Sequence, residues 1–179
     1  MNNLTNCIKT ALLDFYIFQR GAKLACTELW DGFSVADFIV LLKDVVIEIE
    51  IKISLADLYN DVKKGKECYN YENYEKSNRK LVTKHEVISD GRNLYYTPNR
   101  FYFCVPTNIV KETIIFAKTL NSKYGVIEFI TDARLKHSIK VVKRANNLHN
   151  ANNVSKYSNK MIARLCNDLT KRYRLLYWK

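Results

Sequence analysis

Several features that would place this chain in a familiar class are missing from its sequence. No apolar run approaches the roughly eighteen residues of a membrane-spanning helix, which argues against a span. The five cysteines are scattered and form no Cys-x-x-Cys pair, so neither a zinc site nor a disulfide framework is indicated. No signal peptide is evident either. We therefore expect a cytoplasmic protein with reduced, mostly buried thiols.

Internal repeats and linker-like segments are also lacking. A chain of 179 residues without them is expected to form one domain, large enough for a full hydrophobic core. We expect the core of this domain to cover about residues 3–132. A basic C-terminal extension would cover about residues 133–179.

Acidic residues are scarce only in this C-terminal extension, not in the rest of the chain. Residues 133–179 contain twelve Lys or Arg residues and one acid, Asp168, whereas the preceding residues hold seventeen of each sign. The net charge of +11 therefore resides in the last quarter of the chain. A neutral body with a basic appendage favours a polyanionic partner, in particular a nucleic acid, over a merely solvated basic tail.

The run Val45–Lys52, which reads VVIEIEIK, is the stretch around which the chain is organised. Apolar and charged residues alternate in it, which is the period of a β-strand. Its isoleucines would share one face, and Glu48, Glu50 and Lys52 would share the other. A row of charges on the solvent face of an antiparallel strand is the plain alternative.

A second strand-like run at 36–42 precedes it, and a turn at Lys43–Asp44 would join the two as a hairpin. Asp37 would then lie beside Glu50. Magnesium commonly takes one or two carboxylates, so these two acids are candidate ligands of Mg²⁺, or of Mn²⁺ as a substitute. Lys52 would orient the attacking water or neutralise charge on a phosphate. The pattern predicts metal-dependent phosphodiester cleavage.

Asp37 and the triplet Glu50-Ile51-Lys52 resemble the motif of the PD-(D/E)XK nuclease superfamily, with Ala36 in place of an optional proline. Within this superfamily, further stretches resemble nuclease-like proteins related to the DNA-repair protein MmcB. These stretches are Glu28–Asp37, Ile53–Leu58 and Asn99–Pro106. Residues 64–69 depart from the Lys-Trp-Pro-x-Tyr segment of that group.

The resemblance implies an α/β, restriction-endonuclease-like core, in which helices flank a central mixed β-sheet and a basic C-terminal helix completes the domain. It also implies a magnesium-dependent deoxyribonuclease, in particular an endonuclease of DNA repair or recombination. Glu28 becomes an accessory metal or water ligand in this comparison, or else a carboxylate at the rim of the site. A homodimer would suit cleavage of branched DNA by paired nicks.

Two other functions stay open at this stage. The same fold could bind nucleic acid without cutting it. The basic C-terminal helix could instead bind an acidic protein partner.

Five basic side chains are candidate contacts to DNA phosphates. Lys63 and Lys64 would lie on a helix after the catalytic strand, and Lys156, Lys160 and Arg164 would follow one side of the C-terminal helix. Counterion release would make their contribution independent of DNA sequence.

Hydrophobic periodicity predicts the remaining elements. The predicted helices cover 3–20, about 55–71, 109–120 and 157–176, and the further strands cover 23–30, 101–105, 124–130 and, at an edge, 138–142. Trp30 is expected in the core, with a base-stacking surface as the alternative. His85 is expected to be a surface histidine, with assistance to proton transfer as the alternative.

Overall fold

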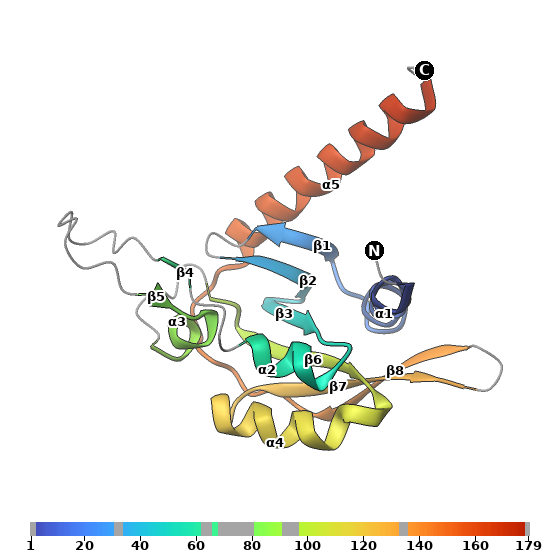
Figure 1. Ribbon diagram of the computed structural model, residues 1–179. Helices are drawn as coiled ribbons and strands as arrows, with labels where there is room; N and C mark the ends of the chain where they lie inside the picture. Colours follow the sequence, from blue (N-terminus) through green and yellow to red (C-terminus); the bar gives the residue numbers. More distant parts are fainter. Residues whose placement is uncertain are drawn as a thin grey trace.

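The computed structural model describes residues 3–30, 34–61, 66–67, 81–90, 97–132 and 136–177 (Figure 1). The helices and strands in chain order are α1 (Asn3–Leu13), the π-helical η1 (Asp14–Gln19), β1 (Leu24–Trp30), β2 (Val35–Leu42), β3 (Val45–Ile51), α2 (Leu55–Asn60), β4 (Lys66–Glu67), β5 (Leu81–Val82), α3 (Lys84–Asp90), β6 (Arg100–Pro106), the 3₁₀ turn η3 (Thr107–Ile109), α4 (Val110–Leu120), β7 (Gly125–Thr131), β8 (His137–Lys143) and α5 (Val154–Tyr177).

A six-stranded mixed sheet forms the centre of the molecule, in the order β1-β2-β3-β6-β7-β8. The first three strands are an antiparallel meander, β6 is parallel to both β3 and β7, and β8 returns antiparallel at the edge. The parallel pairs require crossover connections, which α4 provides between β6 and β7. The expected α/β class, with helices flanking a mixed sheet, is confirmed.

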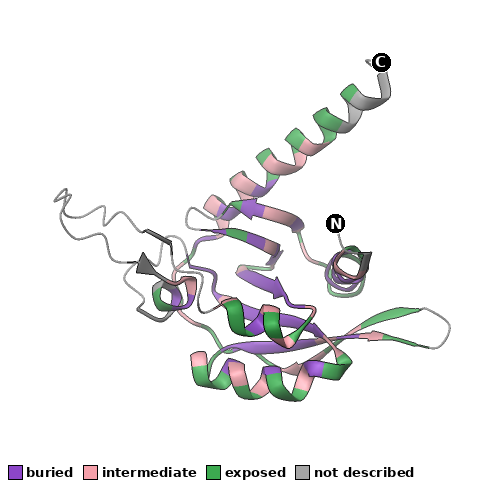
Figure 2. Cartoon of the chain, viewed as in Figure 1, coloured by how far each residue is buried: buried purple, intermediate pink, exposed green. Residues whose placement is uncertain are grey.

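The alternation in β3 divides the sheet into two differently covered faces. Its isoleucines pack with α1 and η1, through residues such as Ile8 and Leu12, in one apolar cluster. The other face, which bears Glu48 and Glu50, is covered by α2, α3 and α4 over the β6–β7 side. The start of α5 covers this face over β1 and β2 (Figures 1 and 2). The acids therefore lie between two apolar clusters.

The register of the meander aligns acids from three strands. Phe38 pairs with Ile49, so Asp37 is opposite Glu50, as the hairpin predicted. In the β1–β2 pair, Thr27 and Leu29 pair with Phe38 and Ala36. Glu28, between them, therefore lies opposite Asp37. Glu28 has a positive φ of 55°, so the backbone of β1 is irregular at this point.

Helix α5 confirms the predicted C-terminal helix and extends away from the sheet (Figure 1). Tyr157 and Met161 near its start are fully buried against β1 and β2, whereas Leu169, two turns further on, is 66% exposed. Within the described ranges, none of the helices is both long and apolar enough to cross a membrane.

Two predictions about local structure are wrong. The helix predicted over 55–71 stops being helical before Lys66–Glu67, because these residues pair with Leu81–Val82 as a small antiparallel ribbon. Tertiary pairing overrides the helical periodicity here. Trp30 is 54% exposed rather than buried, because it is the last residue of the edge strand β1.

Candidate active site

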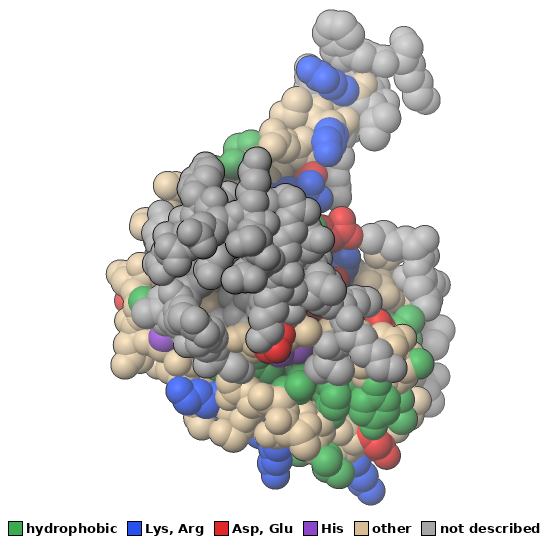
Figure 3. Space-filling model, turned by 60° about the vertical axis from the view of Figure 1, so that its left-hand side comes forward, with side chains coloured by type: hydrophobic (Ala, Val, Ile, Leu, Met, Phe, Trp, Pro, Cys, Tyr) green, Lys and Arg blue, Asp and Glu red, His purple; other side chains and the backbone are tan. Residues whose placement is uncertain are grey.

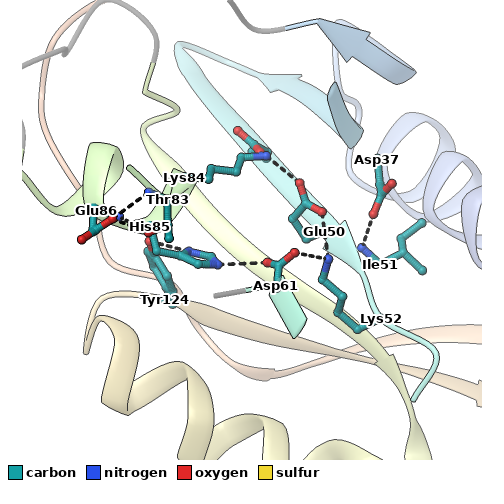
Figure 4. Close-up of polar contacts among 11 residues, drawn as sticks. Asp37, Glu50, Ile51, Lys52, Asp61, Thr83, Lys84, His85, Glu86 and Tyr124 are labelled. Atoms are coloured by element: carbon teal, nitrogen blue, oxygen red, sulfur yellow. Dashed lines mark hydrogen bonds and ion pairs between the residues drawn. The ribbon is translucent and has the colours of Figure 1, made fainter. Parts of the chain in front are cut away.

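The charged face of β3 is buried. Glu48, Glu50 and Lys52 are 0%, 7% and 4% exposed, so the alternative of a solvated row of charges is wrong. Buried charges need partners, since an ion removed from water without compensation is strongly destabilised. The partners arrive from β2, α2 and α3 (Figure 4).

Asp37 and Glu50 come together as the sequence predicted. Oδ2 of Asp37 accepts a hydrogen bond from the backbone N–H of Ile51 at 2.8 Å, which holds the carboxylate at the end of β3. Burial and the neighbouring negative charge of Glu50 raise the pKa of Asp37 to about 6. The two carboxylates are therefore close enough to repel each other strongly.

Two lysines hold Glu50 from opposite sides. Nζ of Lys84 donates to Oε1 at 2.6 Å and Nζ of Lys52 donates to Oε2 at 3.3 Å. Burial alone would raise the pKa of Glu50, but the charges of Lys84 and Lys52 outweigh it and the pKa is lowered. Lys84 also contacts the buried carboxylate of Glu48. Glu50 is therefore ionised, with each oxygen bound to an ammonium group.

Lys52 has a second acid beside it. Its Nζ donates to Oδ1 of Asp61 at 2.7 Å, and Oδ2 of Asp61 lies 3.0 Å from Nε2 of His85. Burial would lower the pKa of Lys52, but Glu50 and Asp61 outweigh it and raise the pKa. Asp61 in turn has a lowered pKa, because its bonds to His85 and Lys52 overcome the effect of burial.

Local sequence places these partners. The hydroxyl of Ser54 accepts from the N–H of Asp57 at 3.1 Å and starts α2, whose Leu58 is fully buried. Asp61 follows Leu58 by three residues and so lies on the same inward face. This spacing could have identified Asp61 from the sequence.

The N-terminus of α3 is fixed by a capping box. The N–H of Thr83 donates to Oε2 of Glu86 at 2.6 Å, and the N–H of Glu86 donates back to Oγ1 of Thr83 at 3.2 Å. Lys84 and His85 lie between the two capping residues. The sequence Thr-Lys-His-Glu was therefore the available signal that a helix starts here.

His85 is 4% exposed, so the prediction of a surface histidine is wrong. Its ring lies edge-on to Phe101, with centroids 5.5 Å apart, and against Phe103 and Tyr124. Two aromatic residues of β6 and the residue before β7 thus enclose the histidine. Periodicity within residues 84–90 alone does not reveal these distant contacts.

Charge and donor chemistry fit a divalent cation. The site gathers four carboxylates and two ammonium groups, namely Asp37, Glu48, Glu50, Asp61, Lys52 and Lys84. With all of them ionised, two negative charges are in excess. Burial first, and then the negative charge of Glu50, raise the pKa of Asp37. In the described part of the chain no three acid, histidine or cysteine side chains converge on one point. Asp37 and Glu50 would be the protein ligands, a number that is ordinary for Mg²⁺.

Glu28 contacts cations outside this cluster. Its Oε1 accepts from Nζ of Lys9 at 2.8 Å, and its Oε2 lies 3.8 Å from Arg164. The hydrogen bond and charge of Lys9 lower the pKa of Glu28. Its role as an accessory ligand stays a prediction.

The structure describes three of the five candidate DNA contacts. Lys63 and Lys64 lie outside the described residues. Lys156 and Lys160 lie half-buried on the first turns of α5, and Figure 3 shows basic side chains further along this projecting helix. Arg164 is engaged with Glu28 and, at 3.3 Å, with Asp168.

Comparison with known proteins adds evidence on the fold. No protein-family model matches the chain, and no curated protein matches it either. A solved structure does, described as the SPO1766 protein of unknown function from Silicibacter pomeroyi. The match has a TM-score of 0.52 and 17% identity, and it covers 94% of this chain and 86% of the other. The two chains share a fold. The description of SPO1766 assigns no activity.

Proposed function

We propose that this chain is a magnesium-dependent deoxyribonuclease of the PD-(D/E)XK type, cutting DNA internally. The observation that carries the proposal is the meeting of Asp37, Glu50 and Lys52 at the ends of β2 and β3 in a buried, negatively charged site. Each residue was expected there from the motif that it resembles.

Asp37 and Glu50 would hold the metal ion, for which Mn²⁺ could substitute. Each Glu50 oxygen already accepts from a lysine, but a carboxylate oxygen has two lone pairs and can serve both. When bound, Mg²⁺ supplies positive charge that polarises the phosphate and acidifies a water molecule.

Lys52 would act on the reacting atoms directly. A water oxygen forms a bond to phosphorus as the bond to the leaving sugar oxygen breaks, and negative charge grows on the phosphate oxygens. An ammonium group placed beforehand in a water-poor site stabilises that charge more than it stabilises the ground state. Lys84, on the other side of Glu50, would add to the positive field over the phosphate.

The basic C-terminal quarter supports DNA as the partner. α5 packs over β1 and β2 on the same sheet face as Glu48 and Glu50, so its lysines would extend the site's contacts along a phosphate backbone. The net charge of +11 favours association with a polyanion through long-range attraction.

A nucleic-acid-binding module without cleavage is the second candidate function. It is favoured by the two lysines that already neutralise Glu50, because they occupy both of its oxygens. In that case DNA would bind equally well with and without magnesium and stay intact.

Cleavage of a panel of labelled duplex, nicked, flapped and branched DNAs with Mg²⁺ separates the two candidates. We expect wild type to cut at least one substrate, and Asp37→Asn and Glu50→Gln to lose at least about a hundredfold in rate. Asp44→Asn, at an exposed carboxylate in the β2–β3 turn, is the matched control and should cut normally. Cleavage by both site variants at the wild-type rate would refute the assignment.

A further inference from the structure

A chain of hydrogen bonds leads from Lys52 into the apolar cluster of β6, β7 and α4. It runs from Nζ of Lys52 to Asp61 at 2.7 Å, from Asp61 to Nε2 of His85 at 3.0 Å, and from Nδ1 of His85 to the hydroxyl of Tyr124 at 3.1 Å (Figure 4). Its members come from the end of β3, the end of α2, the start of α3 and the residue before β7. Segments distant in sequence therefore converge on one ammonium group.

The direction of each bond follows from the chemistry of the groups. An ionised Asp61 can only accept, so Nε2 of His85 must carry a proton and donate it. In the neutral ring Nδ1 is then an acceptor, and the hydroxyl of Tyr124 is the donor. Asp61 thus selects the Nε2–H tautomer of the neutral His85 ring, and the hydroxyl of Tyr124 holds the other ring nitrogen in place.

The far end of this chain is rigid. Tyr124 is fully buried, and its ring lies 4.6 Å from that of Phe101, within the apolar cluster of β6, β7 and α4. His85 is enclosed by the same rings, so it has little room to turn. In such surroundings hydrogen bonds are strengthened and misplaced polar groups are costly.

We propose that Asp61, His85 and Tyr124 are positioning residues, which hold the Lys52 ammonium at a fixed place and direction for the reaction. This inference rests on the proposed nuclease function. An ammonium group has three N–H donors. Glu50 and Asp61 take two of them in the part of the chain that the structure describes, which leaves the third for water or phosphate. Without Asp61, Lys52 would be held by the longer bond to Glu50 alone.

The gentlest test removes one oxygen atom. Tyr124→Phe keeps the ring but deletes the donor to His85, and Tyr102→Phe is its matched control. Tyr102 is also buried, and its hydroxyl accepts one hydrogen bond, from the N–H of Ala145 at 3.1 Å, which the variant loses. Tyr102 lies on the sheet face away from the site. A purely structural role predicts similar behaviour of the two variants.

Single-turnover cleavage and DNA affinity in Ca²⁺ separate positioning from binding. We expect Tyr124→Phe to cut about tenfold more slowly with unchanged affinity, as is typical when a group supporting a reactive side chain is lost. His85→Ala should lose more, and His85→Gln should regain part of the rate, because its amide can still donate to Asp61. Tyr102→Phe should cut at the wild-type rate. Equal rates for the two Tyr→Phe variants would overturn the proposal.

Nitrogen NMR provides a readout that needs no cleavage. Wild type should show His85 protonated at Nε2 and unprotonated at Nδ1, together with a Lys52 ammonium signal protected from exchange. Tyr124→Phe should broaden or shift both signals, and Tyr102→Phe should leave them unchanged. An unaltered Lys52 signal in Tyr124→Phe would overturn the positioning role. A wild-type protein that cuts no DNA, but shows the expected signals, would refute the nuclease function alone.

Discussion

At the scale of single residues, the surroundings of Asp37 disfavour its ionised form. Its pKa, near 6 rather than 3.8, means that the folded protein binds a proton there more tightly than the unfolded chain does. The contribution of Asp37 to stability therefore falls as the pH rises from about 4 to 6 and this carboxyl loses its proton. A group that costs stability in its charged form is typical of a functional site.

Asp37→Asn should consequently stabilise the protein at pH 7 in EDTA. The amide oxygen can still accept from Ile51, while the cost of burying a charge and the repulsion with Glu50 both disappear. We expect a gain of up to about 2 kcal/mol at pH 7, measured by urea unfolding, and almost none at pH 4, where the wild-type carboxyl is largely protonated. An equal effect at both pH values would show that repulsion by Glu50 is not its cause.

Lys52→Ala tests the residue that is proposed to act on the phosphate. Its loss should slow cleavage at saturating enzyme by about a hundredfold or more, because the ammonium stabilises charge that appears in the transition state. DNA binding in Ca²⁺ should be nearly unchanged. Lys23→Ala, which removes an exposed lysine of the same charge, should affect neither measurement. Weaker binding with a normal single-turnover rate would make Lys52 an ordinary phosphate contact.

Residue-scale prediction from the sequence succeeded where the information was local. The alternation in β3 and the short turn before it were enough to bring Asp37 beside Glu50 and Lys52. Lys84 and His85 reach the site through packing of α3 against β6, which no spacing in the sequence encodes. Two signals were local. The capping box predicts where α3 begins, and the Leu58–Asp61 spacing predicts that Asp61 faces inward. Neither predicts which side chains come into contact.

At the scale of elements, α5 combines two roles along one helix. Its first turns are anchored in the apolar cluster over β1 and β2, and its later turns extend beyond the sheet. Hydrophobic periodicity predicted the helix correctly, but the same apolar stripe continues where the sheet no longer covers it. The sequence alone therefore could not indicate where the helix leaves the body.

The stability of two variants, Met161→Ala and Leu169→Ala, shows where along α5 the helix stops packing against the sheet. Met161 is fully buried and Leu169 is 66% exposed, although both lie on the same stripe. We expect Met161→Ala to lower the free energy of unfolding by about 2–4 kcal/mol, and Leu169→Ala to change it by less than about 0.5 kcal/mol. Similar losses for the two variants in chemical denaturation would mean that Leu169 is covered in solution.

The basic side of α5 should set the salt dependence of DNA binding. Replacing both Lys156 and Lys160 with Gln should weaken binding at low salt and reduce the slope of log K against log [salt] by about two. Lys111→Gln with Lys118→Gln, which removes the same charge from the exposed side of α4, is the control and should leave the slope nearly unchanged. An identical slope in the α5 variant would exclude these lysines from the interface. Arg164 is left unchanged so that its ion pairs with Glu28 and Asp168 stay intact.

At the scale of the whole molecule, charge and topology divide the chain differently. The charge of +11 comes from the last quarter, whereas the site residues come from the neutral remainder. The neutral remainder supplies the site residues from two parts of the fold. The β1–β2–β3 meander joins neighbouring strands through short connections, but the parallel pairing of β3 with β6 closes the long connection spanning residues 52–99.

This topology has a consequence for the order of folding. Contacts between neighbouring segments form faster than contacts that must close long loops, because closing a long loop costs more chain entropy. The acid-bearing hairpin should therefore exist before Lys84 and His85 dock onto it. In a nascent chain at that stage, Lys52 already follows the acid-bearing strand, but Lys84 has not yet reached Glu50, so the charge of the acids is only partly neutralised. Under the proposed nuclease function, catalytic competence would then appear in the final step of folding, and incompletely folded copies would leave DNA undamaged.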